Sequence, residues 1–377
     1  MEVGIIKPNV PDQLVIDLAR RLYGLEVIEM KKLVSFDDQN FHIKVAKEHH
    51  NPHISQISED GYILKFTNAV RSAMEGNFDS IHAGLFHLNK KGIRAPLPIT
   101  NLEGKTWKME KVPLLNEDSL CNISAPKICG VHLLKFIPGV PVSTQEYTAD
   151  ILYDWGVFLA RFHNAVQDLD HPGFRTKTIF WNLEHIPELR NLMDGLEDDR
   201  KKLVLSVLDK YPSEIEKNMD HLTRGIIHGD FNGHNILVQM KSTEENANVI
   251  SIDGVLDFED MHHGTYVWDI GLMLAYTFMD CKTMDPLEGA GHALAGYLSL
   301  RYLSSLEMSV LKTCMESRLC QSLVICAYSY RTDSTNSYLL STAKNGWSRL
   351  EKICNTSNEC LLQKWKKVQE NYESKNV

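Results

Sequence analysis

The stretch Pro138-Gly139-Val140-Pro141 separates two parts of the chain that have different hydrophobic patterns. No other feature constrains the fold as strongly, because this stretch continues neither a strand nor a helix without interruption. Before it, short runs of strand-forming residues alternate with Asn, Asp, Gly and Pro. After it, apolar residues recur with the period of long helices. A chain of 377 residues can bury two cores, so we predict two lobes, residues 1–137 and residues 138–377.

The two parts differ in the elements that they are expected to form. In the first, helices are predicted at residues 14–25, where Leu14, Leu18 and Leu22 share one face, and at residues 78–91. Strands are predicted at residues 27–36, 41–47, 61–66, 106–112 and 130–136. In the second part, helices are predicted at residues 144–166, 196–222, 265–279, 288–303, 310–330 and 338–353. The predicted fold class is α+β, with a small β-rich N-terminal lobe and a larger, mainly helical C-terminal lobe.

The composition disfavours several kinds of partner. The formal net charge is -9 and no run of Lys and Arg provides a local exception, so we expect no nucleic-acid partner. The longest apolar run, Ile270–Met279, is about half of the roughly 20 residues that cross a bilayer, and the N-terminus lacks a signal-peptide core. The eight cysteines contain no C-x-x-C pair, which favours reduced thiols. We therefore expect a cytoplasmic protein with no membrane segment and no obligate protein partner.

The strongest chemical signal is GIIHGDFNGHNILV at residues 225–238. It has the spacing H-x-D-x-x-x-x-N, formed by His228, Asp230 and Asn235. In kinases, this spacing lets one loop place an aspartate beside a substrate hydroxyl and an asparagine oxygen on a magnesium ion. We predict that Asp230 is catalytic and that Asn235 is a metal ligand, while His228 braces the loop.

A second acidic motif follows the first. The run VISIDGVLDFED at residues 249–260 is strand-like up to Val255 and Leu256 and then reaches Asp257. A carboxylate at such a strand end can hold Mg²⁺ against the β- and γ-phosphates of a nucleotide, so Asp257 is the second predicted metal ligand. Taken singly, each aspartate can equally be the cap of a turn. The joint order of the motif residues favours the site, and Asp269 is given a structural role.

The nucleotide side carries weaker signals. Lys65 lies on the opposite face of a strand from Tyr62, Leu64 and Phe66, and a strand lysine upstream of such a pair of motifs is typical of an α- and β-phosphate ligand. Its predicted partner is Asp79, with Glu75 as the alternative. The candidate phosphate loop at residues 33–46 contains no glycine, and there Asn40 is a candidate donor, although a plain hairpin fits equally well. The base is expected near residues 134–137, around Phe136.

Together these segments resemble the aminoglycoside phosphotransferase and choline kinase superfamily, with a corresponding domain at about residues 30–300. More narrowly, SFDDQNFHI, FWNLEHIPELR, GHALAGY and TAKNGW resemble the hydroxylysine kinase subgroup. The resemblance implies a two-lobed protein-kinase-like fold, Mg²⁺, and phosphoryl transfer from GTP, with ATP as another possible donor. The implied acceptor is 5-hydroxy-L-lysine, which gives 5-phosphohydroxylysine in amino-acid catabolism. Asp79 is shorter than the glutamate usual in the family at the position that pairs with the lysine.

Other functions fit parts of the same pattern. A kinase for choline, ethanolamine or homoserine shares the chemistry, although choline requires an aromatic cage for its quaternary ammonium. A nucleotide-binding pseudokinase is disfavoured because Asp230, Asn235, Asp257 and Lys65 are all present. A protein kinase is disfavoured because the chain has no A-P-E segment and little room for an activation loop between Asp257 and Gly264.

Overall fold

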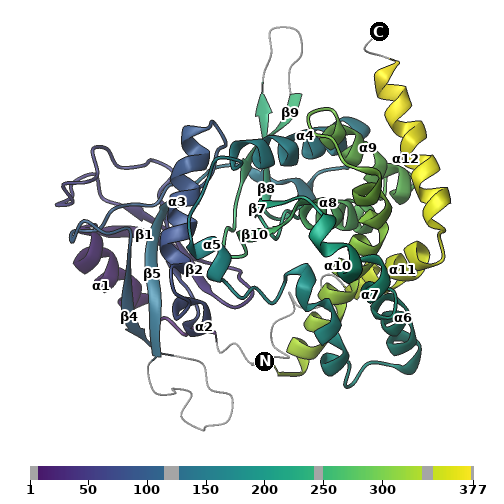
Figure 1. The fold of residues 1–377 in the computed structure, drawn as a ribbon. Coiled ribbons are helices and arrows are strands. Elements are labelled where there is room, and N and C mark those ends of the chain that lie inside the picture. The colour runs from purple at the N-terminus through teal and green to yellow at the C-terminus, as the bar shows by residue number, and fades with distance from the viewer. Residues whose placement is uncertain (1–6, 114–126, 242–248, 333–342, 375–377) are drawn as a thin grey trace. The chain divides into compact units, whose positions relative to one another are not determined.

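The computed structural model describes residues 7–113, 127–241, 249–332 and 343–374 (Figure 1). The chain forms two compact units. The first comprises Met1–Pro138 with Asp170–Lys177, and the second comprises Gly139–Leu169 with Thr178–Val377. The short segment 170–177 belongs to the first unit although it follows the boundary that the sequence predicts.

The first unit is built on an antiparallel five-stranded sheet with the order β1-β2-β3-β5-β4. Its strands are β1 (Val27–Leu33), β2 (Gln39–Val45), β3 (Tyr62–Phe66), β4 (Trp107–Val112) and β5 (Lys127–Lys135). Its helices are α1 (Asp12–Tyr23), α2 (Ala69–Ser72), α3 (Asn77–Lys90) and α5 (Gly173–Thr176). Phe41 and Ile43 alternate with more exposed residues along β2, and they share one core with Leu18 of α1. The period-two pattern of the strands therefore sets which face of the sheet is buried.

The second unit is mainly helical and carries two small antiparallel sheets. One pairs β7 (Arg224–Ile227) with β10 (His262–Thr265), and the other has the order β6 (Val140–Pro141), β8 (Ile236–Lys241), β9 (Val249–Val255). Its α-helices are α4 (Ala149–Ala165), α6 (Asp198–Leu208), α7 (Tyr211–Glu214), α8 (Tyr266–Asp280), α9 (Pro286–Leu298), α10 (Ser305–Thr332), α11 (Ala343–Cys354) and α12 (Asn358–Glu373). Its 3-10 helices are η1 (Val142–Thr144), η2 (Leu183–Leu192) and η3 (Glu216–His221). The strands of these small sheets flank both acidic motifs: the first motif lies between β7 and β8, and the second lies between β9 and β10.

One predicted helix differs from the structure. Residues 196–222 form three short helices, α6, α7 and η3, rather than one. Pro212 lies in the first turn of α7, and a proline cannot donate the backbone hydrogen bond that would continue α6. The apolar period continues across the break between α6 and α7 because both helices pack against α10.

No helix within the described ranges combines the length and the apolar character needed to span a membrane.

Candidate active site

The loop that follows β7 is fixed by Asp269, in the first turn of α8. This side chain is fully buried, and its two oxygens accept hydrogen bonds from the backbone N–H groups of His228 at 2.7 Å and Gly229 at 2.8 Å. Hydrogen bonds to a carboxylate are stronger than those between neutral groups. The structural role given to Asp269 from the sequence corresponds to these two contacts.

Asp269 is itself oriented by two more helices. His163 of α4 donates Nε2–H to Asp269 Oδ2 at 3.1 Å, because an ionised carboxylate only accepts. The hydroxyl of Tyr297 on α9 lies 3.0 Å from Nδ1 of His163 and donates to it. Burial lowers the pKa of His163, so the imidazole is neutral and uses one nitrogen as a donor and the other as an acceptor. Burial also acts to raise the pKa of Asp269, but the bonds from His163 and the loop outweigh it and the pKa is lowered.

His228 uses both ring nitrogens inside the loop. Nε2 donates to the carbonyl of Leu256 at 3.0 Å, and Nδ1 accepts from the N–H of Asp230 at 3.2 Å. Neither nitrogen is left for acid–base work, which agrees with a bracing role. Gly229 adjoins it with φ +81°, and an added Cβ would lie 2.5 Å from the carbonyl oxygen of Asp260. The two acidic motifs are thus held together through a position that requires glycine.

The Asp230 carboxylate is held at both oxygens. Asn235 Nδ2 donates to Oδ2 at 2.9 Å, and Arg318 Nη2 of α10 donates to Oδ1 at 2.7 Å. Burial raises the pKa of Asp230; the charge of Arg318 opposes the shift, while Asp260 and Asp257 add to it. The arginine therefore helps to keep this carboxylate ionised where other acids crowd it.

Asn235 and Asp257 are brought close by the pairing of β8 with β9. Ile236 faces Val255 in the register, and the N–H of Leu256 donates to the carbonyl of Asn235 at 2.8 Å. Asp257 is exposed and has φ 59°, which makes it the one described non-glycine residue with a positive φ. Such a conformation is uncommon outside glycine and recurs at functional positions.

The oxygens of these two side chains fit Mg²⁺ better than a softer metal. Within the described ranges, no group of three or more His, Cys, Asp and Glu side chains is arranged to hold a metal ion. Mg²⁺ does not need such a group, because it is commonly bound by one or two carboxylates together with waters and substrate phosphates. Asn235 and Asp257 offer that kind of incomplete oxygen set.

In the first unit, Lys65 lies on β3 and forms an ion pair with Asp38, with Nζ 3.3 Å from Oδ2. Asp38 is buried just before β2, and its Oδ1 accepts from the backbone N–H of Asn68 at 2.8 Å and from Nδ2 of Asn68 at 3.1 Å. The predicted partner Asp79 instead accepts from Trp107 Nε1 at 2.8 Å. The structure thus pairs Lys65 with Asp38 instead of the predicted Asp79. Asp79 lies exposed in the first turn of α3, and the alternative, Glu75, lies exposed just before that helix.

Asn40 and Phe136 also have defined places in this unit. Asn40 faces Lys65 across the β2–β3 pair, and its Oδ1 is buried without a hydrogen-bond partner among the described residues. Phe136 follows β5 and stacks on the ring of His42, with 4.1 Å between the ring centroids. The structure thus brings Asn40 and Lys65 together at one point of the sheet, while their predicted contact with nucleotide stays a prediction.

Three contributors were missed at the level of sequence: Asp38, His163 and Arg318. Asp38 had a usable signal, because it lies two residues before Asn40 on the same face of the hairpin and so diagonally across from Lys65. His163 is 106 residues from Asp269, and Arg318 is 88 residues from Asp230. Their own helices give no local sign of these contacts.

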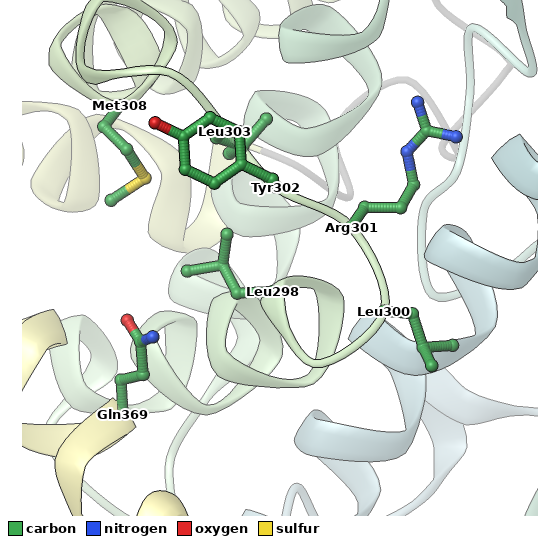
Figure 2. A pocket seen from close by; sticks show the side chains of 7 residues that line it. All are labelled: Leu298, Leu300, Arg301, Tyr302, Leu303, Met308 and Gln369. Carbon is green, nitrogen blue, oxygen red and sulfur yellow. The ribbon is translucent and has the colours of Figure 1, made fainter.

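A pocket of about 450 Å³ lies elsewhere in the second unit (Figure 2). It is lined by Leu298, Leu300, Arg301, Tyr302, Leu303, Met308 and Gln369. In Figure 2 the side chain of Arg301 is directed away from Leu298 and Met308. None of the predicted site residues lines this pocket, so it is not part of the candidate active site.

Comparisons with known proteins identify a family and several relatives of this chain. The model of the phosphotransferase enzyme family matches residues 46–303. A hydroxylysine kinase of Bos taurus is 29% identical over 380 residues, which cover 98% of this chain and 96% of that protein. A hydroxylysine kinase of Mus musculus is 28% identical over 364 residues, which cover 95% of this chain and 93% of that protein.

Solved structures show the same fold at lower identity. An amicoumacin kinase in complex with AMP-PNP, Ca²⁺ and Ami has a TM-score of 0.63 and 17% identity, over 93% of this chain and 97% of that one. A microcompartment-associated aminopropanol kinase has a TM-score of 0.64 and 18% identity, over 91% of this chain and 98% of that one. The predicted α+β, protein-kinase-like fold class is confirmed.

Proposed function

This chain belongs to the phosphotransferase enzyme family, and on that basis we propose that it transfers the γ-phosphoryl group of GTP to the hydroxyl of 5-hydroxy-L-lysine. The name of its Bos taurus relative supports this acceptor, because the similarity covers nearly the full length of both chains. The products are 5-phosphohydroxylysine and GDP. A role in amino-acid breakdown and a cytoplasmic location belong to the same proposal.

One observation carries the proposal: the Asp230 carboxylate is fixed by Asn235 and Arg318 beside the loop that presents Asp257. Asp230 orients the substrate hydroxyl and accepts its proton as the new oxygen–phosphorus bond forms and the bond to the leaving GDP oxygen breaks. Asn235 and Asp257 are the residues that hold Mg²⁺. When bound, that ion neutralises charge on the β- and γ-phosphate oxygens.

The residues of the first unit are assigned to the nucleotide. Lys65 binds the α- and β-phosphates, and Asp38 orients the lysine through the ion pair described above. Asn40 supplies a polar group next to Lys65, and Phe136 packs near the base. Asp79 is left without the role of lysine partner, since its carboxylate binds Trp107.

The test is phosphoryl transfer by the purified protein with Mg²⁺, using 5-hydroxylysine, lysine, choline, ethanolamine and homoserine, each with GTP and with ATP. We expect 5-hydroxylysine with GTP to be turned over fastest, and lysine to be inert because it lacks the hydroxyl. Faster turnover of another alcohol would replace the acceptor, and faster turnover with ATP would replace the donor. Nucleotide binding without turnover of any alcohol would favour a pseudokinase.

A further inference from the structure

Among the described residues, Arg318 is the cationic group in direct contact with Asp230, and its surroundings are unusual for an arginine. The residue is 3% exposed, on the long helix α10. Its guanidinium carbon lies 4.8 Å from the ring centroid of Trp181 and 5.6 Å from that of Tyr276. Arginine is rarely buried to this extent unless its charge is matched and its donors are used.

The donors of Arg318 are only partly used. Nη2 donates to Asp230 and Nη1 donates to Oε1 of Gln321 at 3.1 Å. Nε is buried and has no hydrogen-bond partner among the described residues. A guanidinium presents five N–H donors in a planar fork that matches a carboxylate through two parallel bonds. Tyr276 also hydrogen-bonds the guanidinium through its side chain. On the edge formed by Nε and Nη2, which can bind a carboxylate, the donor at Nε is not used by any described residue.

The frame around this edge is fixed. Gln321 donates Nε2 to the carbonyls of Phe180 at 3.1 Å and Asn182 at 3.4 Å, so its Oε1 is held toward Arg318. The carbonyl of Trp181 accepts from Trp268 Nε1 at 3.2 Å. Three elements, α8, α10 and the segment before η2, thus determine where the guanidinium lies. Trp181 and Tyr276, whose rings flank the guanidinium, are only partly buried, so they are the side chains that must move for a ligand to reach this edge.

We propose that Arg318 binds the α-carboxylate of an amino-acid substrate through this edge while Asp230 receives the substrate hydroxyl. This inference rests on the proposed function, and it identifies Arg318 as the group that selects amino acids over simple amine alcohols. Asp230 and the substrate carboxylate then bind the same guanidinium: Asp230 accepts one hydrogen of Nη2, and the substrate carboxylate accepts the other hydrogen of Nη2 together with that of Nε. Amine alcohols without a carboxylate leave the donor at Nε unpaired, and an unpaired buried donor weakens binding.

The experiment compares 5-hydroxylysine with its decarboxylated analogue, 1,5-diamino-2-pentanol, in the unmutated enzyme, Arg318→Gln and Arg318→Lys. We expect the unmutated enzyme to prefer the amino acid in kcat/KM. Arg318→Gln should lower kcat on both substrates, because Arg318 also fixes Asp230. It should in addition reduce the preference about 10- to 100-fold through the KM of the amino acid, and Arg318→Lys should retain part of the preference. Arg349→Gln is the matched control, since Arg349 lies over Phe278 and, within the described ranges, donates to the backbone carbonyls of Met279 and Cys281.

An equal fall in kcat on both substrates, with the preference unchanged, would overturn the proposal and leave Arg318 as a positioning residue for Asp230. Calorimetric binding of L-lysine and cadaverine to the unmutated protein and to Arg318→Gln gives a readout that needs no turnover. Selective loss of L-lysine binding in the variant supports the carboxylate site. Equal binding of both amines by the unmutated protein rules that site out, whereas absence of turnover on 5-hydroxylysine rules out the proposed reaction.

Discussion

At the scale of single residues, the structure separates two kinds of acid near the motifs. Asp269 is buried and bonded to backbone N–H groups, so it organises the loop. Asp230 keeps part of its surface exposed and is held by side chains, so it is placed to meet a ligand. This contrast gives each acid a different signature when it is mutated.

Asp230→Ala should lower kcat by about 10²- to 10⁴-fold while the affinity for nucleotide changes little, because the carboxylate acts on the hydroxyl and not on the phosphates. Steady-state kinetics with 5-hydroxylysine, together with nucleotide binding by calorimetry, measures both quantities. Asp230→Asn controls for shape, and it should also be inactive. Turnover at the unmutated rate in either variant would remove Asp230 from the mechanism.

Asp38→Asn should raise the KM for nucleotide about tenfold, because Lys65 then loses the charge that orients its ammonium group. Lys65→Ala should have a larger effect in the same direction. Asp79→Asn is the matched control, because Asp79 contacts Trp107 instead of the lysine. If Asp79→Asn weakened nucleotide binding and Asp38→Asn did not, the pairing predicted from the sequence would be the functional one.

At the scale of elements, the sequence predicts most of the architecture but not its long-range contacts. The five strands of the first sheet, α3 and the long C-terminal helices through α11 follow from period and punctuation, although residues 338–342 of the predicted 338–353 helix lie outside the described ranges. Apolar spacing alone predicts a single helix over residues 196–222, because this spacing does not register that Pro212 lacks the backbone N–H needed to continue it. Arg318 lies on a helix whose apolar pattern says nothing about a partner 88 residues earlier. Local sequence patterns therefore locate the two acidic motifs, but they do not predict which residues of distant helices contact them.

The contact between α4, α8 and α9 should make stability depend on pH. The folded chain keeps His163 neutral, whereas the unfolded chain protonates it below about pH 6.5, so acid favours unfolding. The lowered pKa of Asp269 acts in the same direction at still lower pH. We expect the Tm to fall between about pH 7.5 and about pH 5.5. The His163→Gln variant should have a lower Tm than the unmutated protein at the higher pH, and its Tm should fall less on going to the lower pH. An equal fall in Tm in both proteins would contradict this account.

At the scale of the whole molecule, nucleotide and metal should stabilise the fold together. A ligand present at about 100 times its Kd stabilises the folded state by about 2.7 kcal/mol, which raises the Tm by a few degrees. GTP with Mg²⁺ should give such a rise in a thermal denaturation experiment, and a chelator should reduce it. Asp257→Ala should lose the part of the rise that depends on metal. A rise that ignores both the chelator and this variant would show that Asp257 does not hold the ion.

The left-handed backbone at Asp257 has a consequence for laboratory evolution. A side chain at this φ costs roughly 1 kcal/mol that glycine does not incur, although glycine loses more entropy on folding. A library screened only for heat resistance should therefore accept Asp257→Gly more readily than Asp257→Ala, and every such clone should be inactive. Sequencing the surviving clones would show whether the residue that gives the highest heat resistance at position 257 differs from the residue that the reaction requires there.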